Sequence, residues 1–168
     1  MPPIKNHAPS WVLPIGHTWI AAHIPHQGSM CLLDRVEFWD ATRIICRAQS
    51  HLSPDNPLRH EGSLGITNGI EYAAQAMAVH GALLAATDVT PAAGFITSVR
   101  SVRWNRLRLD DIDGELEVSA ERLSGNELNI LYEFSLLCAN IVLLSGRASV
   151  ILDAAGNRNL FSTGDKSS

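Results

Sequence analysis

Apolar and polar residues alternate along most of the chain, the pattern of strands that bury one face. Residues 30–50 keep this period of two on both sides of "WDAT", with Ile44, Cys46 and Ala48 on one parity after the break, which predicts a hairpin. Further strands are predicted at 94–104, 114–123, 126–139 and 141–152. Each has one polar face, so we expect them to form an antiparallel sheet.

Residues 69–86 depart from this alternation. They are almost wholly apolar and precede Pro91, so they predict one long helix. At about 100° per residue, one side of this helix carries small residues around Glu71, whereas larger residues lie opposite. The small stripe comprises Glu71, Ala74, Gln75, Ala78 and Ala82, and the large side comprises Ile70, Met77, His80 and Leu84. We expect the large side to fill a core and the small stripe to admit a ligand chain.

A long loop, "LSPDNPLRHEGSLGITNG" at 52–69, leads into the helix. Loops of this length in compact domains are usually functional. The order of hairpin, loop, helix and meander predicts an α+β fold, with an antiparallel sheet wrapped around one long central helix.

Composition narrows the class of protein. The 168 residues fit one domain, and 46% hydrophobic residues against 18% charged ones favour an oligomer with a large core. A net charge of −4 argues against nucleic-acid binding. The apolar helix contains Glu71, Gln75 and His80, so no membrane span is expected, and the N-terminus lacks a signal-peptide core. The three separated cysteines predict reduced thiols in the cytoplasm.

Four segments carry a resemblance to a known family: "IPHQGSMCLLDRV" at 24–36, "GIEYAAQAMAVHG" at 69–81, "GFITSVRSVRW" and "LLSGRASVIL". They resemble the hotdog-fold 3-hydroxyacyl-ACP dehydratases, in particular the predicted dehydratases of aryl-polyene lipid clusters. The resemblance implies a hotdog domain at 21–153, preceded by an N-terminal extension at 1–20. The small and polar residues at 154–168 predict a flexible C-terminal tail.

The same resemblance implies the chemistry. The substrate would be an acyl chain held as a thioester on the phosphopantetheine arm of acyl carrier protein, with no metal and no dissociable cofactor. The protein would work as a cytoplasmic homodimer, or as a heterodimer with another hotdog subunit, with its active site at the subunit interface. A helix carboxylate would assist loss of the 3-hydroxyl, and a histidine from the partner subunit would take the α-proton.

Glu71 falls on the position of that carboxylate, and Gln75 on a glutamine of the same motif that we assign to substrate binding. A structural alternative exists for Glu71. Asn68 and Glu71 form an N-x-x-E pattern that could cap the helix, and the helix dipole favours a carboxylate in the first turn. For catalysis, burial beside the small stripe would raise the carboxyl pKa, as a proton donor requires.

The histidine does not carry over from the family. Its usual "GHFPG" loop is replaced here, with Asn56 and Pro57 about where that histidine would lie, so both are candidate substrate contacts. His26, in the family-like segment, and His60, in the loop, are the two candidate bases, and each could instead be a structural or exposed loop histidine. His23 and His26 are spaced H-x-x-H, but no third ligand follows, so no metal site is predicted.

Two further features are candidate substrate contacts. Gly69 opens the helix, where free backbone N–H groups could polarise a thioester carbonyl, although the glycine could simply serve the turn. Arg100 begins a basic run that continues with Arg103, Arg106 and Arg108. This run could steer an acidic carrier protein, or be a solvated strand face.

Two other functions remain open on the same fold. A thioesterase could use Glu71 to activate water. A non-catalytic hotdog subunit could pair with an active dehydratase.

Overall fold

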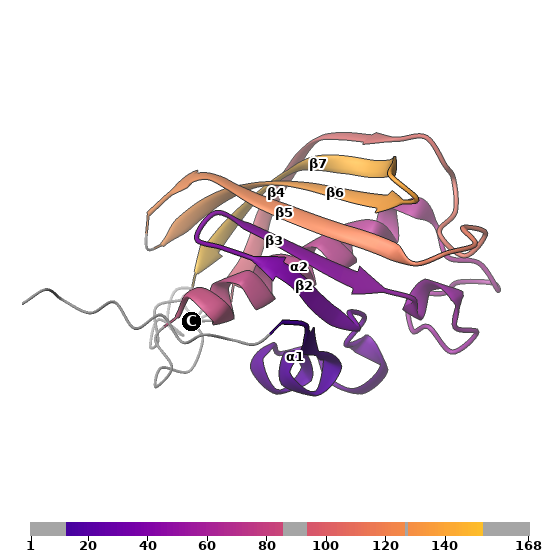
Figure 1. The fold of residues 1–168 in the computed structure, drawn as a ribbon. Coiled ribbons are helices and arrows are strands. Elements are labelled where there is room, and N and C mark those ends of the chain that lie inside the picture. Colours follow the sequence, from indigo (N-terminus) through magenta and orange to yellow (C-terminus); the bar gives the residue numbers. More distant parts are fainter. Residues whose placement is uncertain (1–12, 86–93, 127, 153–168) are drawn as a thin grey trace, which may run out of the picture.

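The computed structural model of the chain describes residues 13–85, 94–126 and 128–152. A seven-stranded antiparallel sheet curves around one long helix, α2 (Gly69–Leu84) (Figure 1). Its strand order is β1-β2-β3-β5-β6-β7-β4. The strands are β1 (Ile15–Gly16), β2 (Arg35–Trp39), β3 (Arg43–Ala48), β4 (Gly94–Trp104), β5 (Leu116–Gly125), β6 (Asn129–Cys138) and β7 (Ile141–Leu152).

The predicted hairpin and the four later strands are confirmed. β2 and β3 pair across a turn in which Asp40 Oδ1 accepts hydrogen bonds from the N–H groups of Thr42 and Arg43, both at 2.8 Å. In β5 the parity of burial follows the sequence pattern, since every second residue from Leu116 to Ala120 is buried. The alternation therefore determines which face of the sheet meets the helix. β4 differs from the expectation of one buried face, because none of its residues is buried in the described chain.

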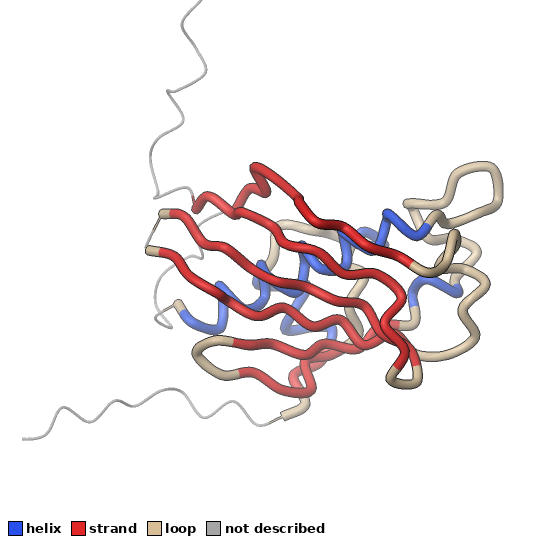
Figure 2. Tube along the Cα trace, turned by 90° about the horizontal axis from the view of Figure 1, so that it is seen from above, coloured by secondary structure: helices blue, strands red, loops and turns tan. Residues whose placement is uncertain are grey.

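α2 lies against one face of the sheet (Figure 2) and contacts β3, β5 and β6. It ends two residues before the predicted end at 86. Met77 and His80 are buried as expected of the large side, whereas Ile70 is half-buried and Leu84 is exposed. Leu84 lies in the last turn, which its neighbours cover less than the middle of the helix.

His80 is a structural residue of this core. Its Nε2 lies 2.8 Å from the carbonyl oxygen of Asp40 and must donate to it, because a carbonyl only accepts. Its Nδ1 then accepts from the hydroxyl of Tyr132, at 2.9 Å. Burial lowers the pKa of His80, so the ring is held neutral.

The first turn of α2 packs unusually close to the sheet. A Cβ at Gly69 would meet the side chains of Leu144 and Leu136 at 2.7 and 2.9 Å. Glycine therefore lets the helix start directly against β6 and β7, which sets the height of Glu71 above the sheet.

The folded unit includes residues ahead of the predicted boundary at 21. Ile15 and Gly16 of β1 pair with β2, and the short helix α1 (His17–His23) follows directly. Residues 1–12, which form most of the predicted extension, and the predicted tail at 154–168 lie outside the described residues.

Charged pairs cover part of the outer face of the sheet. Arg35 contacts Glu115 at 2.5 Å and Glu37 at 3.3 Å, and Arg47 contacts Glu37 at 2.6 Å and Glu117 at 2.9 Å. These residues have the opposite parity to the buried positions of β2, β3 and β5, so the wet face predicted from the alternation is present.

Three free cysteines are present, Cys31 and Cys46 buried and Cys138 half-buried. Within the described ranges, no helix combines the length and apolar character needed to cross a membrane.

Candidate active site

The structure brings two of the predicted residues together. His26 Nε2 lies 2.8 Å from Glu71 Oε1, and the two side chains are 24% and 32% exposed. His26 comes from the segment between α1 and the 3₁₀ turn at Gly28–Met30, and Glu71 from the first turn of α2. The two residues belong to the same chain, whereas the family resemblance implied a histidine from the partner subunit.

The capping alternative for Glu71 is not what the structure shows. Asn68 has helical backbone angles and makes no side-chain cap hydrogen bond; its amide donates instead to the carbonyl of Gly65, at 3.1 Å. Glu71 accepts hydrogen bonds from His26 and, at 3.1 Å, from Gln75 Nε2. Its carboxylate is thus used between side chains and not for capping.

The pKa of Glu71 is lowered, opposite to the direction expected from burial. The hydrogen bond from His26 is the main cause, and the one from Gln75 adds to it; together they outweigh desolvation. Glu71 is therefore an ionised acceptor at neutral pH, and His26 donates its Nε2–H to it. The other ring nitrogen of His26, Nδ1, is buried without a partner among the described residues.

Gln75 is fully buried, which differs from the expectation that it contacts substrate. Its Oε1 accepts from the N–H of Leu32 at 2.8 Å, and its Nε2 donates to the carbonyl of Met30 at 2.7 Å and to Glu71. Both amide hydrogens are used inside the protein.

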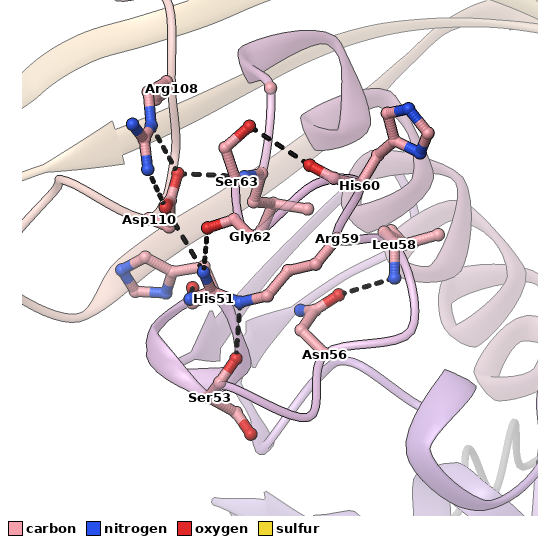
Figure 3. Close-up of polar contacts among 12 residues, drawn as sticks. His51, Ser53, Asn56, Leu58, Arg59, His60, Gly62, Ser63, Arg108 and Asp110 are labelled. Carbon is pink, nitrogen blue, oxygen red and sulfur yellow. Dashed lines mark hydrogen bonds and ion pairs between the residues drawn. The ribbon is translucent and has the colours of Figure 1, made fainter.

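The loop before α2 places its predicted residues away from this pair. The ring of His60 points away from the other labelled side chains (Figure 3). The side chain is 91% exposed, and its Nε2 lies 3.9 Å from Glu61 Oε1. Asn56 is buried, donating to Ser50 O and Tyr72 Oη and accepting from the N–H of Leu58, and Pro57 is exposed. None of these contacts involves Glu71 or His26, so Asn56 serves the loop itself.

Arg59 organises this loop, a role that sequence reasoning missed (Figure 3). Its guanidinium donates to the carbonyls of Ser53, His51 and Gly62, and to Asp110 Oδ2 at 3.2 Å. Asp110, whose side chain is only 5% exposed, also binds Arg108 and the N–H of Leu64. The "R-L-D" at 108–110 is the one local signal for this cluster, because Arg59 is 51 residues away.

The last two candidates also lie apart from the pair. The N–H of Gly69 donates to the carbonyl of Ile66, so it is not free to bind a thioester oxygen. Arg100 is exposed on β4, opposite Arg147 on β7. An open pocket of about 450 Å³ near Arg106, Ile112, Cys138 and Leu143 is not lined by Glu71 or His26.

The small-residue stripe reaches the surface beside the pair. Ala74 and Ala78, one and two turns after Glu71, are half-buried, while Gln75 and Ala82 are buried. Among the described residues, no cluster of three or more His, Cys, Asp or Glu side chains could hold a metal ion. The arrangement offers a proton donor and a proton acceptor next to a partly open apolar strip.

Comparison with known proteins identifies the fold and the family. The ApeP-like family model, described as ApeP dehydratase, matches residues 18–159. The dehydratase heterocomplex ApeI:P from Xenorhabdus doucetiae is similar at 22% identity and a TM-score of 0.68, over 86% of this chain and 94% of that chain. A search of curated proteins finds no match.

Two further solved structures, one of them a thioesterase, are less similar. Thioesterase HI1161 from Haemophilus influenzae has 9% identity and a TM-score of 0.54, over 74% of this chain and 81% of that one. The E. coli PaaI protein of the phenylacetic acid degradation operon has 10% identity and a TM-score of 0.52, over 69% and 80%.

The sheet wrapped around one helix is the hotdog fold, so the predicted fold class is confirmed. The chain belongs to the ApeP-like dehydratase family, whose model matches most of its length. The resemblance to aryl-polyene-type dehydratases and the predicted enzyme class are thereby confirmed.

Proposed function

We propose that the chain dehydrates 3-hydroxyacyl thioesters on acyl carrier protein to trans-2-enoyl thioesters, in aryl-polyene or related lipid synthesis, with Glu71 and His26 as its catalytic pair. The observation that carries the proposal is the 2.8 Å contact between these two side chains beside the half-buried stripe of α2. A titratable pair next to an apolar strip is what proton transfer on an acyl chain requires.

Protons balance within the pair. His26, held by its Nε2–H on Glu71, accepts the α-proton on Nδ1, and Glu71 stabilises the imidazolium that forms. The Nε2 proton then passes to Glu71 and leaves with the 3-hydroxyl as water. One C–H and one C–O bond break, and one C=C bond and one O–H bond of water form. Glu71 is again ionised, whereas His26 is neutral with its proton on Nδ1, which must exchange with solvent for a proton on Nε2 before the next turnover. Because Nδ1 is buried in the single chain, the side chains that cover it must rearrange to admit substrate, while the contact of His26 with Glu71 is kept.

This assignment changes the predicted role of Glu71. A carboxyl with a lowered pKa is not protonated at rest, so Glu71 becomes an acid only after His26 has received the α-proton. His60 is not proposed as the base, because its ring lies in the solvent and pairs with no residue of the site.

A second subunit would complete the substrate groove. β4 pairs only with β7 among the described strands, and it carries Phe95 and Trp104, which are 59% and 52% exposed. An open edge flanked by large apolar side chains favours pairing with another strand. The similar Xenorhabdus protein is described as a heterocomplex, which supports another hotdog subunit as the partner.

The carrier protein is proposed from charge. Arg100, Arg103 and Arg106 are exposed on or just after β4 and form no ion pair with a described residue, while Arg108 is engaged by Asp110. Such a surface favours an acidic carrier whose phosphopantetheine arm delivers the thioester. We place the enzyme in the cytoplasm, where such carriers work, and propose that it needs no dissociable cofactor.

Product analysis tests the proposal. The chain, alone and with its hotdog partner, is incubated with 3-hydroxyacyl-ACP, and the products are separated by mass. Loss of water supports a dehydratase, release of free acid supports a thioesterase, and loss of water only when the partner supplies an intact site supports a non-catalytic subunit.

A further inference from the structure

Gln75 connects the catalytic pair to the chain that carries His26. It lies one turn after Glu71 on α2 and is fully buried. Its amide contacts the backbone on either side of Cys31, with Met30 O at 2.7 Å and Leu32 N at 2.8 Å. Four residues earlier than Met30, His26 contacts Glu71. The segment 26–32 is therefore attached to α2 at both ends.

The backbone contacts fix which way the Gln75 amide points. The N–H of Leu32 can only donate, so it must face Oε1, and the carbonyl of Met30 can only accept, so it must face Nε2. The second hydrogen of Nε2 then points to Glu71 Oε1, at 3.1 Å. If the amide were flipped, its NH₂ group would face the N–H of Leu32, donor against donor, and its oxygen would face the carbonyl of Met30, acceptor against acceptor. The hydrogen bond to Glu71 is thus imposed by the backbone.

This orientation makes the two oxygens of Glu71 unequal. Oε1 receives both donors, His26 Nε2 and Gln75 Nε2. Among the described residues no hydrogen bond to Oε2 is made, and the Glu71 side chain is 32% exposed. Oε2 is therefore the carboxylate oxygen without a hydrogen-bond donor among the described residues.

We propose that Gln75 is a positioning residue, which aligns the His26 segment with α2 and holds Glu71 with Oε1 occupied and Oε2 free. The consequence of this role for catalysis rests on the proposed function. In this role Gln75 makes no contact with substrate.

The groups around Glu71 are few. His26 is the titratable side chain in contact with it, and Gln75 is the neutral donor from its own helix. The thiol of Cys31, between the two backbone anchors, lies 3.8 Å from His17 Nδ1. No other described charged side chain forms an ion pair or hydrogen bond with Glu71. The pH response of Glu71 therefore reports mainly on His26 and Gln75.

The Gln75→Glu variant tests this role. It keeps the shape and the acceptor for Leu32 but loses the donor to Met30 and Glu71. Losing a donor to a carboxylate raises its pKa, so the acidic limb of the kcat/KM profile should move up by about one pH unit or more. At a pH on the acidic limb, kcat/KM should fall about tenfold, through kcat and with little change in KM. Gln75→Met also lacks the donor but adds no charge, so it should shift the acidic limb in the same direction. It is the second variant to measure if Gln75→Glu does not fold.

A matched control separates positioning from general destabilisation. Tyr132→Phe also removes a buried hydrogen bond made by α2, through His80, and should lower Tm without moving the acidic limb. Titration of the Glu71 carboxyl carbon by NMR, without substrate, gives a second readout. An unchanged limb and an unchanged Glu71 titration in both Gln75 variants would overturn the proposal. Absence of dehydration by the wild type would defeat the proposed function, while the NMR titration would still decide the role of Gln75.

Discussion

At the scale of single residues, the hydrogen bond between Glu71 and His26 determines the chemistry that the site can perform. It holds the carboxylate ionised and fixes one N–H of the imidazole, so that its other nitrogen carries the lone pair. A carboxylate that was protonated at rest could not hold the ring in this way. The proposed mechanism therefore starts from an ionised Glu71, and each member of the pair has a distinct test.

Glu71→Gln should abolish dehydration while the protein stays folded. The amide keeps the shape of the side chain but cannot accept and return a proton, so we expect kcat to fall at least about a hundredfold. Activity on 3-hydroxyacyl-ACP and the circular dichroism spectrum are the measurements. Retained turnover in a folded variant would remove Glu71 from the mechanism.

His26→Ala and His60→Ala should differ sharply. His26 contacts Glu71, whereas His60 is almost fully exposed, so only the first should lose activity, by about a hundredfold or more. The His60 variant serves as the matched control for replacing a histidine. If both variants turn over at the wild-type rate, the base is a different group.

At the scale of elements, the loop before α2 is held by buried charge. The neighbouring Arg108, together with the N–H of Leu64, keeps the pKa of Asp110 well below its usual range, and Arg59 joins the same carboxylate to three backbone carbonyls. This cluster fixes the path of the chain that leads into the first turn of the helix, and so supports the position of Glu71.

Asp110 should make stability depend on pH. Its pKa is lower in the folded protein than the value of about 3.9 in the unfolded chain, so the unfolded state binds the proton more readily. The contribution is full above about pH 5 and is lost as the pH falls below about 4. Asp110→Asn should cost about 1–3 kcal/mol at pH 7 and flatten the acid limb of the unfolding free energy in urea melts. The exposed Asp55→Asn should behave as wild type; an equal effect there would contradict this assignment.

Elements and contacts differ in how far the sequence predicts them. The strands were predictable because alternate burial is a local property, as the alternately buried residues of β5 show. Glu71 could be picked out as a candidate because it is a carboxylate in the first turn of an otherwise apolar helix. The roles of Gln75 and Arg59 depend instead on groups far away in the chain. Leu32 lies 43 residues from Gln75, and Asp110 lies 51 residues from Arg59. Which histidine reaches Glu71 depends on the same folding of distant segments.

At the scale of the whole molecule, the two residues of the proposed catalytic pair come from one chain. If His26 and Glu71 act in the same subunit, co-expressing the His26→Ala and Glu71→Gln chains should restore no activity, because no subunit then holds an intact pair. Mass spectrometry of the assembled protein should verify that both chains are mixed. Recovery of part of the wild-type rate would mean that the site is shared between copies.

The free edge of β4 should carry subunit association. Phe95→Lys and Trp104→Glu each place a charge on this apolar edge, and we expect association to weaken about tenfold or more in analytical ultracentrifugation. Leu52→Lys, an exposed apolar position in the loop before α2, is the control. Equal weakening in the control would argue against β4 as the contact.

The two edges of the sheet are very unequal in length. β4 spans 11 residues, whereas β1, at the opposite edge, has 2 residues and is followed at once by α1. A long edge cannot pair along its length with so short a one, so the described sheet cannot add copies head to tail into a growing fibre. When β4 pairs with another long edge strand, neither of the two long edges remains free, and no further copy can be added there. The unequal edges thus make association self-limiting.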